Sequence, residues 1–251
     1  MGKMTNNNTI EPGGTLYVLG TPIGNLEDLT FRAARILKEV DVVVAEDTRR
    51  ARKLLSHLAT RANLVSFHEH NAVSRLPGIL QKLCGGVDVA LLSDAGMPCI
   101  SDPGAMLIQR AREGDLPVVV VPGPSAITSA LTWSGLRVEE FVFLGYFPRK
   151  TVARRKLLAR LQEEQRISVF FESVHRIVKT LGVLAEELPQ TEVIVAREMT
   201  KVHEEMLMDT PDQIIEQLTR NHSIKGEFTV ILDLRKKKAP AKRGAFDKME
   251  N

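Results

Sequence analysis

Residues 87–104 read VDVALLSDAGMPCISDPG, an apolar run followed at once by a segment rich in aspartate, glycine and proline. The apolar part predicts a short buried strand. The second part can be neither helix nor strand for long, because proline removes a backbone donor and glycine favours turns. We therefore expect a strand that ends in a shaped loop, with a helix beginning near Pro103.

Similar strands alternate with helical patterns through the first half of the chain. The sequence predicts them at 15–20, 40–46, 62–67, 87–92 and 116–121. Such alternation indicates parallel strands with helical crossovers. The four consecutive valines at the end of the fifth run predict that both faces of the sheet are covered.

The pattern becomes less regular in the second half. Strands are predicted at 141–147, 166–173, 191–198, 203–209 and 227–234, and the third and fourth of these are close enough to form a hairpin. Ser173 is the expected N-cap of a helix whose apolar face carries Ile177, Leu181, Leu184 and Leu188. A mixed sheet fits this half better than a parallel one.

The sequence thus predicts an α/β protein of two α/β domains, the first with a parallel sheet and helical crossovers, the second with a mixed sheet. The expected boundaries are a flexible N-terminus at 1–14, an N-terminal domain at 15–135, a C-terminal domain at 136–235 and a basic tail at 236–251.

Composition excludes several classes of protein. Of 251 residues, 43% are apolar and 26% charged, as in an ordinary globular protein. No apolar run approaches the roughly 20 residues that span a bilayer, and the N-terminus lacks the apolar region of a secretion signal. Cys84 and Cys99 are too few for a disulfide framework or a zinc site. We expect a cytoplasmic protein without membrane or metal.

The segment after each strand of the first domain is unusual. In chain order these segments are GTPIGN, EDTRR, HEHN, SDAGMPCISDPG and PGPSA. Ligands of open α/β sheets bind beyond the carboxyl ends of the strands, so all five lie on the binding rim. Neither a dinucleotide fingerprint nor a P-loop motif is present. Exposed backbone, small side chains and carboxylates suit S-adenosylmethionine, although this chemistry alone does not single it out.

Seven motifs, in order and spacing, carry a family resemblance: YVLGTPIGNLEDLT, AEDTRR, SDAGMPCISDPG, VPGPSA, FFESVHR, ARE-TK with the following HEE, and KGEFTVIL. From about Leu16 to Leu234 the chain resembles the tetrapyrrole methylase superfamily, and within it the ribosomal RNA small subunit methyltransferase I branch. The resemblance implies a class III S-adenosylmethionine methyltransferase of two domains, a homodimer, with the cofactor held between the domains. It also implies ribose 2'-O-methylation of a cytidine in the decoding region of 16S ribosomal RNA, on free RNA or on the small ribosomal subunit.

The resemblance also implies which residues bind the cofactor. They are Asp94, Ala95, Gly96, Met97, Pro98, Ile100, Ser101, Asp102, Pro122, Gly123, Pro124, Ser125, Ala126, Ala196, Gly226 and Glu227. For Asp102, capping of the helix at Pro103 is the favoured interpretation. For Asp94, ligand contact and turn formation both stay open.

The expected reaction removes a proton from the ribose hydroxyl, so a general base within hydrogen-bond reach would help. The candidate catalytic residues are Glu46, Asp47, Glu198 and Lys201. Each has a structural alternative. Glu46 and Asp47 would cap the following helix and pair with nearby arginines, and Glu198 and Lys201 would form an ion-pair network.

A polyanionic partner is indicated by clusters of basic residues. The candidate RNA-binding residues are Arg49, Arg50, His68, His70, Arg149, Lys150, Arg154, Arg155 and Lys156. The alternative for the last five is the wet face of an amphipathic helix. His68 and His70 lack an evident third ligand for a metal, so RNA contact or polar surface is the better interpretation.

Three rival functions remain open. A methylase of tetrapyrroles shares the expected fold but acts on a macrocycle, and a diphthamide-type protein methylase is a second rival. A noncatalytic RNA-binding assembly factor is the third, and cofactor binding without turnover would identify it.

Overall fold

The computed structural model describes residues 13–100, 104–220 and 224–235. The chain divides into two compact units between Ala126 and Ile127. We had expected the domain boundary after residue 135. The difference is helix α5 (Ala126–Trp133), whose buried Ile127 and Leu131 group with the second unit.

The first unit contains a five-stranded parallel sheet in the order β3-β2-β4-β1-β5. Its strands are β1 (Leu16–Leu19), β2 (Val42–Ala45), β3 (Asn63–Ser66), β4 (Val89–Leu92) and β5 (Val118–Val121). Its helices are η1 (Leu26–Asp28), α1 (Phe31–Glu39), α2 (Thr48–His57), α3 (Ala72–Cys84) and α4 (Gly104–Glu113). The predicted parallel sheet with helical crossovers is confirmed.

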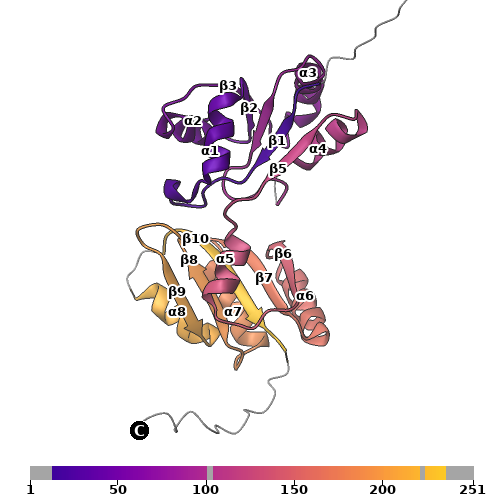
Figure 1. Ribbon diagram of the computed structural model, residues 1–251. Helices are drawn as coiled ribbons and strands as arrows, with labels where there is room; N and C mark the ends of the chain where they lie inside the picture. Colours follow the sequence, from indigo (N-terminus) through magenta and orange to yellow (C-terminus); the bar gives the residue numbers. More distant parts are fainter. Residues whose placement is uncertain (1–12, 101–103, 221–223, 236–251) are drawn as a thin grey trace, which may run out of the picture. The chain divides into compact units, whose positions relative to one another are not determined.

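Helices cover both faces of this sheet, as Figure 1 shows. On β2, Val43 packs in a cluster with α1 and α2, while the next residue, Val44, packs in a cluster with α3 and α4. This alternation follows from the period of two along a strand. The four valines of β5 are an exception to the prediction of two covered faces: β5 lies at an edge, and Val120 is 51% exposed.

The second unit contains a mixed sheet in the order β6-β7-β10-β8-β9, in which β6 and β7 are parallel and the other pairs antiparallel. Its strands are β6 (Phe141–Tyr146), β7 (Ile167–Ser173), β8 (Val193–Arg197), β9 (Glu205–Asp209) and β10 (Glu227–Asp233). After α5, its helices are α6 (Thr151–Glu164), α7 (Ile177–Glu187) and α8 (Pro211–Thr219). The predicted mixed sheet and the β8–β9 hairpin are confirmed.

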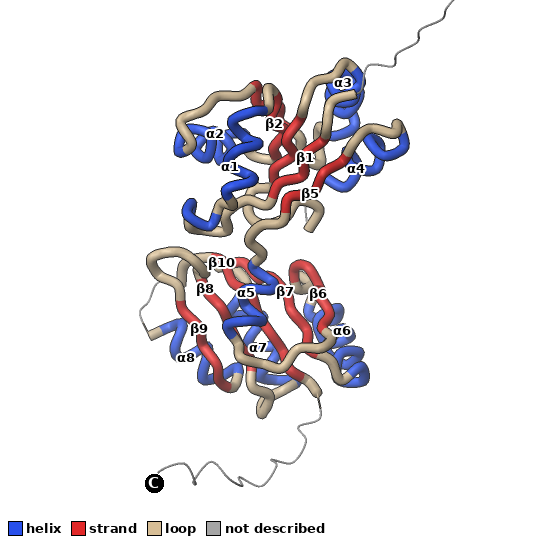
Figure 2. The backbone as a smooth tube through the Cα atoms, in the orientation of Figure 1, coloured by secondary structure: helices blue, strands red, loops and turns tan. Residues whose placement is uncertain are grey.

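Helices α6, α7 and α8 supply the core of this unit together with one face of the sheet. Figure 2 shows α5 on the opposite side of the sheet from α7. The predicted apolar face of α7 is confirmed, because Ile177, Leu181, Leu184 and Leu188 are all buried. The predicted start of α7 is wrong: Ser173 is the last residue of β7, and Arg176 is the N-cap.

Candidate active site

In the first unit, the loops that leave β1 and β4 are joined by a short antiparallel bridge. The backbone N–H of Thr21 donates to the carbonyl of Gly96 over 2.9 Å, and Gly96 donates back over 3.1 Å. Gly96 has a φ of +80°, a conformation that glycine adopts without steric cost. The buried hydroxyl of Ser93 also donates to the Gly96 carbonyl, over 2.9 Å. Gly96 therefore fixes the path of the loop that follows β4.

The loops after β1 and β5 approach each other even more closely. A Cβ atom added at Gly20 would lie 2.6 Å from Gly123 Cα, and one added at Gly123 would lie 2.8 Å from Gly20 Cα. Real Cβ atoms essentially never come this near to backbone. Side chains at these two positions would force the loops apart, so the rim depends on both glycines.

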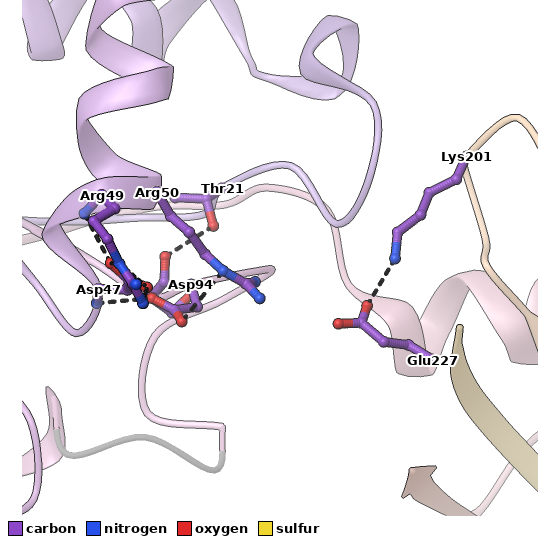
Figure 3. A network of polar contacts seen from close by, with 8 residues as sticks. Thr21, Asp47, Arg49, Arg50, Asp94, Lys201 and Glu227 are labelled. Carbon is purple, nitrogen blue, oxygen red and sulfur yellow. Dashed lines mark hydrogen bonds and ion pairs between the residues drawn. The ribbon is translucent and has the colours of Figure 1, made fainter. Parts of the chain in front are cut away.

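Asp94 ties the β4 loop to the loop after β2. One of its carboxylate oxygens accepts the backbone N–H of Asp47 over 2.9 Å, and the other lies 3.6 Å from Nε of Arg50. Figure 3 shows these side chains together with Thr21 and Arg49. Asp94 therefore shapes these loops, and its contact with the cofactor stays a prediction.

Asp47 is the N-cap of α2, the structural alternative that we considered for it. Its carboxylate accepts the backbone N–H of Arg49 over 2.8 Å and forms an ion pair with the same guanidinium over 2.6 Å. The side-chain hydrogen bond from Arg49 holds the pKa of Asp47 well below its ordinary value. A carboxylate with so low a pKa is a weak proton acceptor.

The surface of these loops fits a cofactor that is read mainly through backbone. Ala95 and Pro122 are exposed, Met97 and Pro124 are half-buried, and Ile100 is 47% exposed. The expected residues on the β4 loop and on the β5 loop thus surround the glycine contacts just described. Ser101 and Asp102 lie outside the described residues.

In the second unit, Glu198, Lys201 and Glu227 form a cluster where β8 ends and β10 begins. Nζ of Lys201 lies 2.8 Å from Glu198 Oε1 and 3.0 Å from Glu227 Oε2. The backbone N–H of Glu227 donates to the same Glu198 oxygen over 3.0 Å. The Lys201 to Glu227 contact is drawn in Figure 3. The predicted network of ion pairs is therefore present.

Backbone conformation holds this cluster in place. Glu198 and Gly226 have φ values of +49° and +107°. A Cβ at Gly226 would lie 2.4 Å from Cγ of Glu198, so only glycine leaves room for that side chain. Ala196, the remaining predicted cofactor residue of this unit, is buried within β8 and pairs with Thr229 of β10.

Both partners of the Glu198–Lys201 pair keep their charges at neutral pH. Burial opposes the charge of Glu198, but hydrogen bonds from Lys201 and from the Glu227 backbone lower its pKa below the ordinary value. Burial likewise opposes the charge of Lys201, yet hydrogen bonds to Glu198 and Glu227 raise its pKa. The cluster therefore presents fixed charges and is poorly suited to proton transfer.

Of the two histidines after β3, only His70 is exposed. His68 is half-buried; its Nε2 lies 3.1 Å from Asn71 Nδ2, and its backbone N–H donates to Asn71 Oδ1 over 2.8 Å. Within the described residues, no three His, Cys, Asp or Glu side chains are grouped as a metal site. Because its partner Asn71 is the N-cap of α3, His68 helps to shape the start of that helix.

The predicted RNA-binding run on α6 and the loop before it needs a correction. Arg154 is only 1% exposed, and its Nε donates to the carbonyl of Pro148 over 2.7 Å. Arg155 forms ion pairs with Glu186 and Glu187 of α7, over 2.7 and 2.8 Å. Arg154 is therefore unavailable to phosphate, whereas Arg155 is exposed but has its charge balanced by two glutamates.

Apart from Arg155, the exposed members of this run are the two residues at the loop, Arg149 and Lys150, and Lys156 on the helix. The basic surface is thus concentrated at the β6–α6 loop. In the first unit, Arg49 and Arg50 are exposed and interact with Asp47 and Asp94, respectively. Exposed ion pairs contribute little, so both arginines can exchange their partners for phosphate.

Among the described residues, no helix is of the length and apolarity that a membrane crossing requires.

A parallel sheet with shaped loops at the carboxyl ends of its strands and a second unit built on a mixed sheet define an α/β enzyme of the class III methyltransferase architecture. The model of tetrapyrrole (corrin/porphyrin) methylases matches residues 15–215. The chain belongs to this family, whose members are S-adenosylmethionine-dependent methyltransferases. The expected family, fold class and cofactor are confirmed.

The relatives are more specific than the family. The chain is 45% identical over 219 residues, 87% of its length, to a Thermotoga maritima protein named Ribosomal RNA small subunit methyltransferase I, of which it covers 98%. It is 41% identical over 220 residues, 88% of its length, to the Bacillus subtilis protein of the same name, of which it covers 75%.

Solved structures of other proteins share the fold. Diphthine synthase superimposes with a TM-score of 0.70 and 13% identity over 87% of this chain and 90% of that one. Cobalt precorrin-4 methyltransferase superimposes with a TM-score of 0.65 and 15% identity over 87% of this chain and 94% of that one. At such identities the likeness concerns the fold alone.

Two groups of residues escaped the sequence analysis. Gly20 and Thr21 lie in the GTPIGN segment, but the bridge to Gly96 and the contact with Gly123 involve residues about 75 and 100 positions away, as the backbone contacts show. Glu172 and Arg176 lie in the FFESVHR motif and are buried or half-buried charges. The motifs were the only signal for either group.

Proposed function

We propose that this protein transfers a methyl group from S-adenosylmethionine to the 2' oxygen of a cytidine ribose in 16S ribosomal RNA. The observation that carries the proposal is the match, at 41% to 45% identity over most of the chain, to proteins named Ribosomal RNA small subunit methyltransferase I. The exposed basic loop at Arg149 and Lys150 adds a surface suited to phosphate.

We assign cofactor binding to the two loops of the first unit that surround Gly96 and Gly123. When bound, S-adenosylmethionine supplies a methyl group on a sulfonium, which a ribose oxygen attacks in line from about 3 to 3.5 Å. The rigid path of these loops holds the cofactor surface in one conformation before binding, which lowers the entropy lost on association.

The proton of the ribose hydroxyl requires an acceptor, and we assign that role to Glu46. This half-buried carboxylate directly follows β2 and precedes the Asp47 cap on the rim. The other candidates are less suitable, because Asp47 and Glu198 have lowered pKa values and Lys201 has a raised one. We assign Glu198 and Lys201 to orienting the nucleotide through fixed charges.

A ribosomal substrate implies that the reaction occurs in the cytoplasm. The proposal includes a homodimer. Its substrate is either free 16S RNA or the assembled small subunit.

The test is methyl transfer from labelled S-adenosylmethionine to small ribosomal subunits that lack the modification, with the product nucleoside identified by mass spectrometry. We expect 2'-O-methylcytidine from one site, and a kcat about 10²- to 10⁴-fold lower for Glu46→Gln with unchanged cofactor affinity. If subunits and free 16S RNA stay unmethylated although the cofactor binds, the proposal fails. Tetrapyrroles are then the next substrates to assay.

A further inference from the structure

A buried carboxylate organises the start of α7. The side chain of Glu172, at the end of β7, is 0% exposed. Its Oε2 accepts the hydroxyl of Thr180 over 2.7 Å and lies 3.2 Å from Nη2 of Arg176. Its Oε1 accepts the backbone N–H of Ser173 over 2.8 Å. The carboxylate therefore joins the side chains of Arg176 and Thr180, which lie one helix turn apart.

Two arginines extend this network to the loop at 147–150, between β6 and α6. Nη2 of Arg176 donates to the carbonyl of Phe147 and, over 3.3 Å, to the carbonyl of Pro148. Nε of Arg154 donates to the same Pro148 carbonyl over 2.7 Å. The loop is thus fastened through its backbone oxygens by side chains from two different helix starts.

The network contains more positive than negative charge. It places two guanidinium groups against one carboxylate, and burial lowers the pKa of Arg154. In the described part of the chain, Nη1 of Arg154 and Nε of Arg176 are buried without a hydrogen-bond partner. Apolar residues of similar volume commonly replace buried ion pairs without loss of stability, so stability alone is a poor explanation for this arrangement.

The fastened loop carries the exposed cations of the second unit that we assign to RNA. Arg149 and Lys150 are exposed, Lys150 is the N-cap of α6, and the neighbouring Tyr146 is 59% exposed. By contrast, the charge of Arg155 on the helix is balanced by two glutamates. The conformation of this short loop therefore decides where most of the phosphate-binding charge lies.

We propose that Glu172, Arg176 and Arg154 form a positioning device that fixes loop 147–150 in the conformation that presents Arg149 and Lys150 to RNA phosphates. This inference rests on the proposed function. A loop ordered before binding loses less conformational entropy on association, so the device increases RNA affinity without touching the RNA.

The experiment measures the Kd for 16S RNA over a series of salt concentrations. Arg176→Lys keeps the charge but loses the planar fork that bonds two carbonyls and Glu172. We expect about tenfold weaker RNA binding and a slope of log Kd against log salt smaller by about 0.7 to 1.8, the equivalent of one or two phosphate contacts. The Kd for S-adenosylmethionine should not change. The matched control is Arg160→Lys, an exposed member of an ion pair on α6.

A double-mutant cycle separates positioning from general damage. If Arg176 acts through the loop cations, Arg176→Lys has no further effect on RNA affinity in an Arg149→Ala, Lys150→Ala background. Thr180→Val is a second probe, which removes one hydrogen bond to Glu172 and keeps the side-chain volume.

Additive losses in this cycle, or a wild-type salt slope in both Arg176→Lys and Thr180→Val, would overturn the inference while leaving the proposed function intact. A wild-type protein without salt-dependent RNA binding would instead overturn the proposed function, and this inference with it.

Discussion

A methyl group added at Gly123 has no room, because the backbone of Gly20 lies against it. The new Cβ would stand 2.8 Å from Cα and 3.0 Å from C and O of Gly20, whereas ordinary contacts begin at 3.4 Å. The loops after β1 and β5 must therefore separate by about 0.6 Å, the difference between 3.4 and 2.8 Å. Overpacking of this kind costs about 1–3 kcal/mol.

Gly123→Ala should thus lower the free energy of unfolding by about 1–3 kcal/mol. The free variant relieves its strain by separating the two loops. If the cofactor binds only to the unshifted loops, binding must bring them together again, and the free energy of binding becomes less favourable by the cost of that strain. At 1.4 kcal/mol per factor of ten, the Kd for S-adenosylmethionine should rise about 5- to 150-fold. Calorimetric titration and urea unfolding measure the two quantities.

Gly78→Ala is the matched control in the same unit. Gly78 lies in α3, and an added Cβ there has no atom within 4 Å. This variant should unfold with a free energy higher by about 0.5–1 kcal/mol, because alanine favours the helix, and should bind the cofactor normally. Wild-type stability and Kd in Gly123→Ala would refute the close loop contact. Reduced stability with an unchanged Kd would show that the loops pack but do not form the cofactor surface.

Four further variants test single charges. Lys201→Met should lower kcat/KM about 10- to 100-fold, because a charged hydrogen bond is lost. Glu198 and Lys201 stay ionised between about pH 6 and 9, so the pH profiles of kcat for the variant and the wild type should have the same shape over that range. Because the pKa of Asp47 is lowered in the folded protein, its ionised cap stabilises α2 at pH values above the pKa of the unfolded carboxyl group, and this stabilisation is lost as the pH falls through the folded pKa. Asp47→Asn lacks the titrating group, so its free energy of unfolding should fall less than that of the wild type below about pH 5, as measured by urea titration. Arg149→Ala should weaken RNA binding and reduce its salt slope by about 0.7 to 0.9, whereas Arg155→Ala should do neither, since two glutamates already balance that charge; equal slopes for the two variants would contradict the assignment of RNA to the loop.

The strands, and the parallel or mixed character of each sheet, were predictable because the signals for them are local. Apolar runs bounded by glycine, proline and aspartate predicted the ten strands found in the described residues, and the change of pattern near residue 135 separated a parallel from a mixed sheet. The rim followed from topology, since parallel strands place all their carboxyl ends on one edge. The family followed from seven motifs and was confirmed by the comparisons.

Helix starts were less predictable, because competing structures share the same residues. Ser173 is a good N-cap by type, yet its backbone completes β7 and donates to the Glu172 carboxylate, so α7 begins only after Arg176. The division between the two units moved for a similar reason, since α5 carries an apolar face that packs with the second unit.

The sequence by itself determined the class of fold, the edge of the parallel sheet on which the unusual loops lie and the types of residue in those loops. Only tertiary structure decided what each charge does. Asp94 meets the Asp47 backbone 47 residues away, and Arg155 meets Glu186 31 residues away. Arg154 and Arg155 are adjacent letters, but one is buried against the Pro148 carbonyl and the other is exposed. Burial and partners come from segments distant along the chain, and no local pattern encodes them.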